Sequence, residues 1–123
     1  MATRQEQINT ILERLANNLG SDLVGAVAAS SDGMVLAARL GTGVNADRIA
    51  AVAATIVGVT RRVSRDLAIG EPEETILRAN NGLFLVLPAN QQSLLAVNIR
   101  EGSNLGMVRL EAREASAAIA KVL

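Results

Sequence analysis

The chain has 123 residues, of which half are hydrophobic and only one, Phe84, is aromatic. This length is enough for one domain, residues 1–123, with an aliphatic core, and the hydrophobic content excludes a disordered chain. Twelve basic and twelve acidic residues balance to zero net charge, so the sequence has no electrostatic footprint for nucleic acid or for an anionic membrane.

The sequence contains no His and no Cys, which removes the usual general bases, thiol nucleophiles and many metal ligands. The acidic residues Glu71, Glu73 and Glu74 lack the ligand spacing of a calcium loop, so we interpret them as a solvated loop. No signal peptide and no apolar stretch of about 20 residues is visible. We therefore expect a cytoplasmic protein that is not an enzyme, does not insert into membranes and needs no cofactor or metal.

The first predicted elements are a helix and a hairpin. Thr3 and Glu6 have the spacing of a capping box, and apolar residues at helical spacing continue the helix to Leu19. Two apolar runs, residues 23–29 and 34–40, then flank Asp32-Gly33, a dipeptide typical of β-hairpin turns. They predict two paired strands.

The longest helical pattern spans residues 45–67, with Asn45 as its expected cap. At about 100° per residue, its apolar side chains form two adjacent stripes. One stripe consists of Ile49, Val52, Ile56, Val59 and Val63, and the other of Ala50, Ala53, Val57, Thr60 and Leu67. The remaining arc carries only small residues in its first half, namely Ala51, Ala54, Thr55 and Gly58. This helix has more apolar surface than one core can cover.

Three further strands are predicted at residues 75–79, 83–87 and 93–99. A tight turn at Asn80-Asn81-Gly82 joins the first two, and the strand at 75–79, which contains Arg78, is interpreted as a sheet edge. Either Ser103 or Asn104 caps a final helix.

This order predicts an α/β/α sandwich around a five-stranded antiparallel sheet, with the element order α-β-β-α-β-β-β-α. If the first and last helices share one face, the second helix lies alone on the other, and its outer surface has no cover within the chain. We therefore predict a homodimer in which this helix contributes Ala51, Ala54, Thr55 and Gly58, so that Gly58→Asp or Ala54→Glu would disrupt it. The alternative is a helix buried within a monomer.

With these elements in place, the chain resembles the Roadblock (dynein light chain) family. The resemblance rests on the order of elements, the strand from Leu23 to Val27 leading into Ser30–Val35, the small-residue second helix and the Asn80-Asn81-Gly82 hairpin. It implies a homodimer in which second helices pack antiparallel and third strands pair edge to edge, which adds Thr75, Leu77 and Ala79 to the interface. Family members are non-catalytic dimeric platforms, and a bacterial subfamily linked to gliding motility activates small Ras-like GTPases.

The resulting hypothesis is a homodimeric scaffold that binds a small Ras-like GTPase, at most as its activating partner. Arg61, Arg62 and Arg65 are the candidate docking residues for an acidic partner; the alternative is that they form a solvated helix end, where cations suit the helix dipole. Two other functions are compatible with the sequence. One is a scaffold in another signalling or motor complex without effect on GTP hydrolysis, and the other is a small-molecule sensor.

Overall fold

The computed structural model describes residues 1–123 and begins with the predicted helix, α1 (Arg4–Leu19). The capping box is formed as expected. The Thr3 hydroxyl accepts a hydrogen bond from the Glu6 amide at 3.1 Å, and the Glu6 carboxylate accepts one from the Thr3 amide at 3.2 Å. A short 3₁₀ turn, η1 (Gly20–Asp22), leads from the helix into the sheet.

Five strands form one antiparallel sheet in the order β2-β1-β5-β4-β3. They are β1 (Leu23–Ser30), β2 (Val35–Arg39), β3 (Thr75–Ala79), β4 (Gly82–Asn90) and β5 (Ser93–Arg100). The strand β3 is an edge, as predicted. The strand β4 continues beyond the predicted end at residue 87, because a register shift between Pro88 and Asn90 accommodates a proline that has no amide hydrogen to donate.

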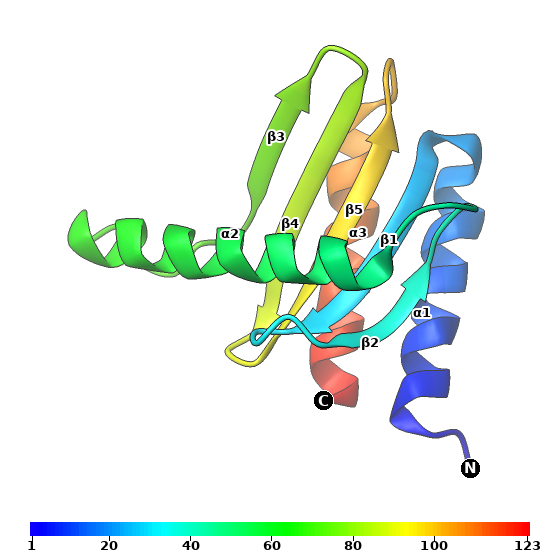
Figure 1. Ribbon diagram of the computed structural model, residues 1–123, viewed down its shortest axis with the longest axis horizontal. Coiled ribbons are helices and arrows are strands. Elements are labelled where there is room, and N and C mark those ends of the chain that lie inside the picture. Colours follow the sequence, from blue (N-terminus) through cyan, green and yellow to red (C-terminus); the bar gives the residue numbers. More distant parts are fainter.

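Helices cover both faces of this sheet, which confirms the predicted α/β/α sandwich (Figure 1). On one face, α1 and α3 (Leu105–Val122) pack side by side over the larger core, which contains Leu12, Leu95 and Ile119. On the other face, α2 (Ala46–Asp66) lies alone over a smaller core that contains Val27, Val86 and Leu94.

Asparagine side chains cap the other two helices. Asn45 Oδ1 accepts from the Arg48 amide at 3.2 Å, and Asn104 Oδ1 accepts from the Met107 amide at 3.1 Å. The neighbouring Ser103 donates instead to the Arg100 carbonyl, so Asn104 is the cap of α3.

The helix α2 is longer than the part of the sheet that it covers. Its 21 residues correspond to about 31 Å at 1.5 Å per residue, whereas the strands it packs on, β2, β1, β5 and β4, lie about 4.8 Å apart. Its C-terminal turns therefore extend past the β3 edge, as Figure 1 shows at its left side. None of the three helices has the length and apolar character needed to cross a bilayer.

Candidate interaction surface

The sheet-facing side of α2 is built from small side chains. Ala50, Ala53 and Val57 are at most 3 % exposed, and they belong to the second of the two apolar stripes described above. Because alanine side chains are short, the helix axis can approach the sheet closely at these positions. The first stripe is consequently rotated to the side of the helix rather than into the core.

That first stripe is the surplus apolar surface of the molecule. Val52, Val59 and Val63 are 49 %, 57 % and 48 % exposed, while Ile49 and Ile56 are half-buried at its inner margin. In the overhanging end, Leu67 and Ile69 are also exposed. We call Val52, Ile56, Val59 and Val63 the branched flank of α2. Single exposed aliphatic residues are common in monomers, but a contiguous row of this length indicates a contact surface.

The small residues predicted for the interface lie on the other side of α2. Ala51, Thr55 and Gly58 are exposed and Ala54 is half-buried. The backbone of Ala51 lies against the β1–β2 turn, where a Cβ added to Gly33 would be 3.3 Å from the Ala51 Cα. This small-residue flank therefore faces the β1–β2 and β4–β5 turns, and the branched flank faces the opposite end of the strands.

The predicted strand residues of the interface share the α2 face of β3. Thr75, Leu77 and Ala79 pair with Val86, Phe84 and Gly82. Val86 belongs to the core under α2 and Phe84 packs against it, so directly opposed partners point to the same side. Leu77 is 58 % exposed.

These strand residues lie toward the β3–β4 end of the sheet, which is the end that the branched flank faces. The structure thus places them on the side of α2 away from the small-residue flank. A shallow hollow of about 450 Å³, bordered by Leu77, Ala79 and Phe84, lies beside the β3–β4 turn.

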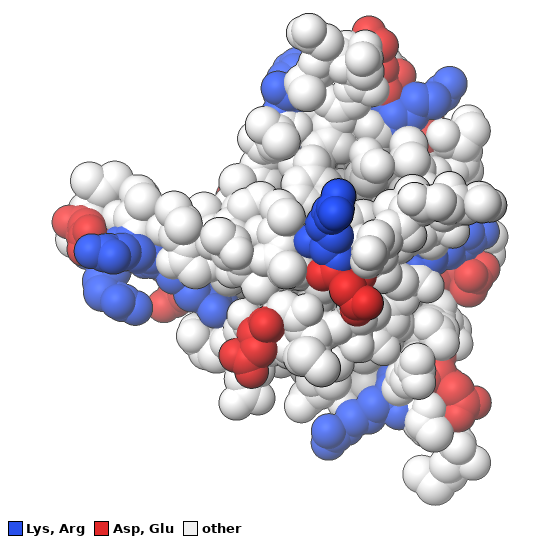
Figure 2. All heavy atoms as spheres, viewed as in Figure 1, with Lys and Arg blue, Asp and Glu red and all other residues white.

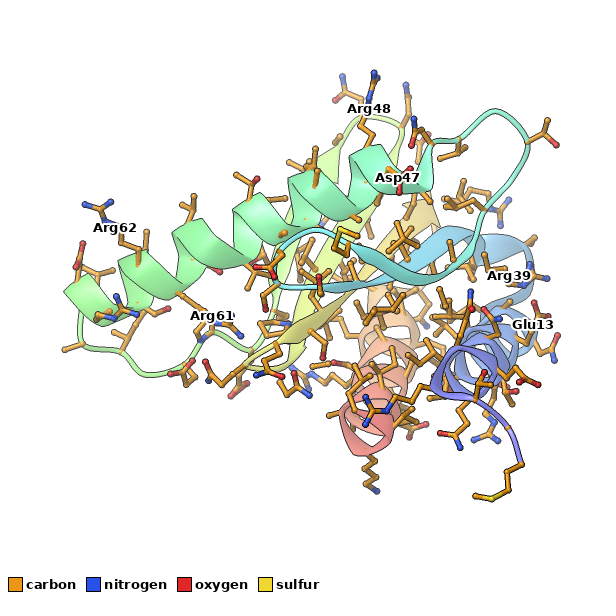
Figure 3. All side chains as sticks on the ribbon, turned by 60° about the horizontal axis from the view of Figure 1, so that its bottom comes forward. Glu13, Arg39, Asp47, Arg48, Arg61 and Arg62 are labelled. Atoms are coloured by element: carbon orange, nitrogen blue, oxygen red, sulfur yellow. The ribbon has the colours of Figure 1, made fainter.

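The three candidate docking arginines do not form one ridge. Arg61 is half-buried and donates to the carbonyl oxygens of Asn90 at 2.9 Å and Gln91 at 3.3 Å, which ties α2 to the β4–β5 turn. Arg62 projects away from the sheet, in a different direction from Arg61 (Figure 3). Arg62 and Arg65 are exposed and make no ion pair within the chain.

A partly buried ion-pair cluster, missed by the sequence interpretation, holds the start of β3. The Glu74 carboxylate is 13 % exposed and binds both Arg109 and Arg113 of α3, the latter at 3.1 Å. The hydrogen bond from Arg109 is the main cause of the lowered pKa of Glu74; burial opposes it, and the charges of both arginines reinforce it. The signal available in the sequence was the four-residue spacing of the two arginines, which places them on one side of a helix.

On the face of the molecule that α2 covers, charged side chains are unevenly distributed along the helix. Figure 2 shows a largely uncharged stretch along the middle of the helix, with basic and acidic side chains gathered at its two ends. No group of three or more acidic side chains is placed to hold a metal ion. The uncharged row along the helix (Figure 2) is suited to binding another protein.

Comparisons with known proteins give one family and one fold. The family model described as the Roadblock/LC7 domain matches residues 8–98. A curated relative, an uncharacterized protein of Methanocaldococcus jannaschii, is 26 % identical over 112 residues, which cover 91 % of this chain and 92 % of the relative.

Two solved structures have the same fold at low sequence identity. The gliding protein MglB of Thermus thermophilus is similar with a TM-score of 0.86 and 22 % identity, covering 99 % of this chain and 92 % of that one. The MglB of Myxococcus xanthus gives a TM-score of 0.89 and 16 % identity, covering 99 % and 91 %.

Proposed function

The chain belongs to the Roadblock/LC7 domain family, and from that premise we propose that it is a non-catalytic homodimeric scaffold that binds a small Ras-like GTPase. The observation that carries the proposal is the exposed branched flank of α2, a helix whose C-terminal turns extend past the edge strand β3 (Figure 1). A second copy is the simplest partner for a row of apolar side chains beside an unpaired strand edge.

A two-fold axis at the β3 edge would provide a partner for the unpaired strand edge, for the α2 overhang and for the branched flank. The two β3 strands would pair and continue the sheet. Each α2 overhang would lie over the other subunit, which would cover Val63 and the exposed end of the helix. The two branched flanks would then meet, with Thr75, Leu77 and Ala79 of both copies below them.

Adjacent residues on opposite flanks of α2 provide the test. We expect the wild-type protein to be dimeric by light scattering coupled to gel filtration. Val59→Asp should produce a monomer, because it places a carboxylate in the apolar contact, whereas Gly58→Asp should leave the dimer intact. Dissociation by Gly58→Asp alone would assign the interface to Ala51, Ala54, Thr55 and Gly58, and a monomeric wild type would overturn the homodimer.

For the GTPase, support comes from the likeness to MglB, which is described as a gliding protein, and from the exposed Arg62 and Arg65. A purified Ras-like GTPase from the same source is mixed with the dimer, and binding and single-turnover GTP hydrolysis are measured. Binding with faster hydrolysis indicates an activating partner, and binding without acceleration indicates a scaffold. The absence of binding to every such GTPase would contradict this proposal.

Charge reversal locates the docking surface. The double variant Arg62→Glu/Arg65→Glu should weaken GTPase binding about tenfold or more, because two cations facing an acidic partner become anions. The control is Arg4→Glu/Arg14→Glu on α1, which changes net charge equally at exposed positions on the other face of the sheet.

A further inference from the structure

Two charged residues at the ends of α2 stand on one line along the helix. Asp66 follows Arg48 by 18 residues, which is five turns at 3.6 residues per turn, so both project in the same direction. Both are exposed, and neither forms an ion pair within the chain. Figure 3 shows that Arg48 projects away from the sheet.

Both charges oppose the helix dipole. Arg48 lies in the first turn, where a negative charge is favoured, and Asp66 is the last helical residue, where a positive charge is favoured. The neighbouring Asp47 and Arg65 follow the usual preference. Unfavourable charges at both ends of α2 indicate that another interaction compensates for them. No such interaction is found within this chain.

The line from Arg48 to Asp66 borders the branched flank. Val59 is 11 residues from Arg48 and is therefore displaced by about 20° around the helix, and Thr55 of the small-residue flank, 7 residues from Arg48, is displaced equally on the other side. The line is thus the boundary between the two flanks. The midpoint of Arg48 and Asp66 is Val57, and the midpoint of Val52 and Val63 falls between residues 57 and 58. The pair of charges and the apolar row therefore have the same midpoint along the helix, to within one residue.

A row that pairs with its own copy about a two-fold axis must be antiparallel, with its centre on the axis. Arg48 then lies opposite Asp66 of the partner subunit, and the reverse contact forms at the other end. A parallel arrangement would instead place like charges together.

We propose that Arg48 and Asp66 form two reciprocal intermolecular ion pairs that bracket the branched flank and fix the antiparallel register of the α2 contact. The proposal rests on the homodimer proposed above and identifies which of its residues set orientation. The valines supply the apolar contact, and the two end charges exclude other alignments.

Charge exchange tests this directly. Arg48→Asp alone gives two carboxylate–carboxylate contacts in its homodimer, and Asp66→Arg alone gives two arginine–arginine contacts. Each should raise the dimer dissociation constant about tenfold at low salt. An equal mixture of the two variants should form mixed dimers well above the statistical half, measured by native mass spectrometry, and the double variant should dimerise like wild type.

Helix damage cannot account for that outcome, because both single substitutions favour the helix dipole. The matched control is the exchange of Asp47 and Arg65, which are also five turns apart but lie on the line of the small-residue flank. Asp47→Arg and Arg65→Asp should show no preference for mixed dimers.

Each of the other outcomes would contradict either the homodimer, the ion pairs or the choice of flank. A monomeric wild type overturns the homodimer and the ion pairs together. A dimeric wild type with statistical mixing of the Arg48 and Asp66 variants overturns the ion pairs and leaves the homodimer standing. A preference for mixed dimers of the Asp47 and Arg65 variants moves the contact to the small-residue flank.

Discussion

At the scale of single residues, two polar contacts hold α2 and β3 in position. Glu74 joins the start of β3 to Arg109 and Arg113 on one face of the sheet. Arg61 joins α2 to the β4–β5 turn on the other. Both side chains occur in runs of like charge. The sequence analysis interpreted the glutamates as a solvated loop and the arginines as docking residues or a solvated helix end. Which member of such a run is buried depends on tertiary contacts that periodicity does not contain.

Glu74→Gln should lower the free energy of unfolding by about 1 kcal/mol at pH 7, because the two arginines that share the carboxylate remain partly solvated. The pKa of Glu74 is lowered by folding, so its contribution is complete above its ordinary pKa near 4.5 and is lost as pH falls through the folded pKa. Urea unfolding between pH 7 and pH 3 should show a smaller decrease for Glu74→Gln than for wild type. Glu73→Gln is the exposed control, and an equal pH slope in both variants would contradict the role of Glu74.

Arg61→Ala should destabilise the protein by about 1–2 kcal/mol, since the carbonyls of Asn90 and Gln91 lose their donor. Amide exchange in the β4–β5 turn should also become faster. Arg62→Ala, one residue along and exposed, should remain within about 0.5 kcal/mol of wild type. Equal effects of the two substitutions would show that the contacts of Arg61 contribute nothing to stability.

At the scale of elements, the order, the layers and most boundaries could be predicted because capping residues, turn dipeptides and periodicity are local signals. The rotation of α2 could not. The first of its two stripes is the more apolar in the sequence, yet the second faces the sheet. Its alanines allow a closer approach to Val27, Val86 and Leu94 than the branched residues would. The surplus surface was therefore foreseen, but the interface residues assigned to α2 remain a prediction.

The contact between the β1–β2 turn and α2 requires a glycine. Gly33 has a φ of +87°, and an added Cβ would press against the Ala51 backbone. Gly33→Ala should reduce stability by about 2 kcal/mol, from backbone strain and helix displacement. Gly41→Ala, with nothing within 4 Å of the added Cβ, is the control. Thermal unfolding at equal concentration compares them, and an unchanged midpoint for Gly33→Ala would contradict the close approach.

At the scale of the whole molecule, the α2 overhang and the β3 edge make the two sides of the domain unequal. On the β2 side, Arg39 pairs with Glu13 of α1 at 3.1 Å and the helix lies against the strand. On the β3 side, no helix covers the strand. Assembly through β3 would leave β2 as the edge of the joined sheet, already protected by α1.

Amide exchange can detect that assembly. In an antiparallel pair, alternate amides of an edge strand point outward and are open to solvent in the monomer. If β3 pairs with a second β3, these amides should exchange slowly at high protein concentration and faster on dilution below the dissociation constant. The amides of β1, which is paired on both sides, should not respond except through global unfolding. Outward amides of β3 that exchange equally fast at all concentrations would exclude strand pairing.

Phe84 of β4 pairs with Leu77 of the edge strand β3 on the α2 face of the sheet, and the chain has no Trp and no Tyr. Its side-chain ring resonances in a proton spectrum therefore come from one residue located at the proposed contact, so their line shapes would follow self-association without any introduced probe. The same composition makes the protein nearly silent in tryptophan fluorescence. The tryptophan emission of a partner protein would then be measured without any contribution from this chain. Complex formation could therefore be followed by titration with both proteins unlabelled.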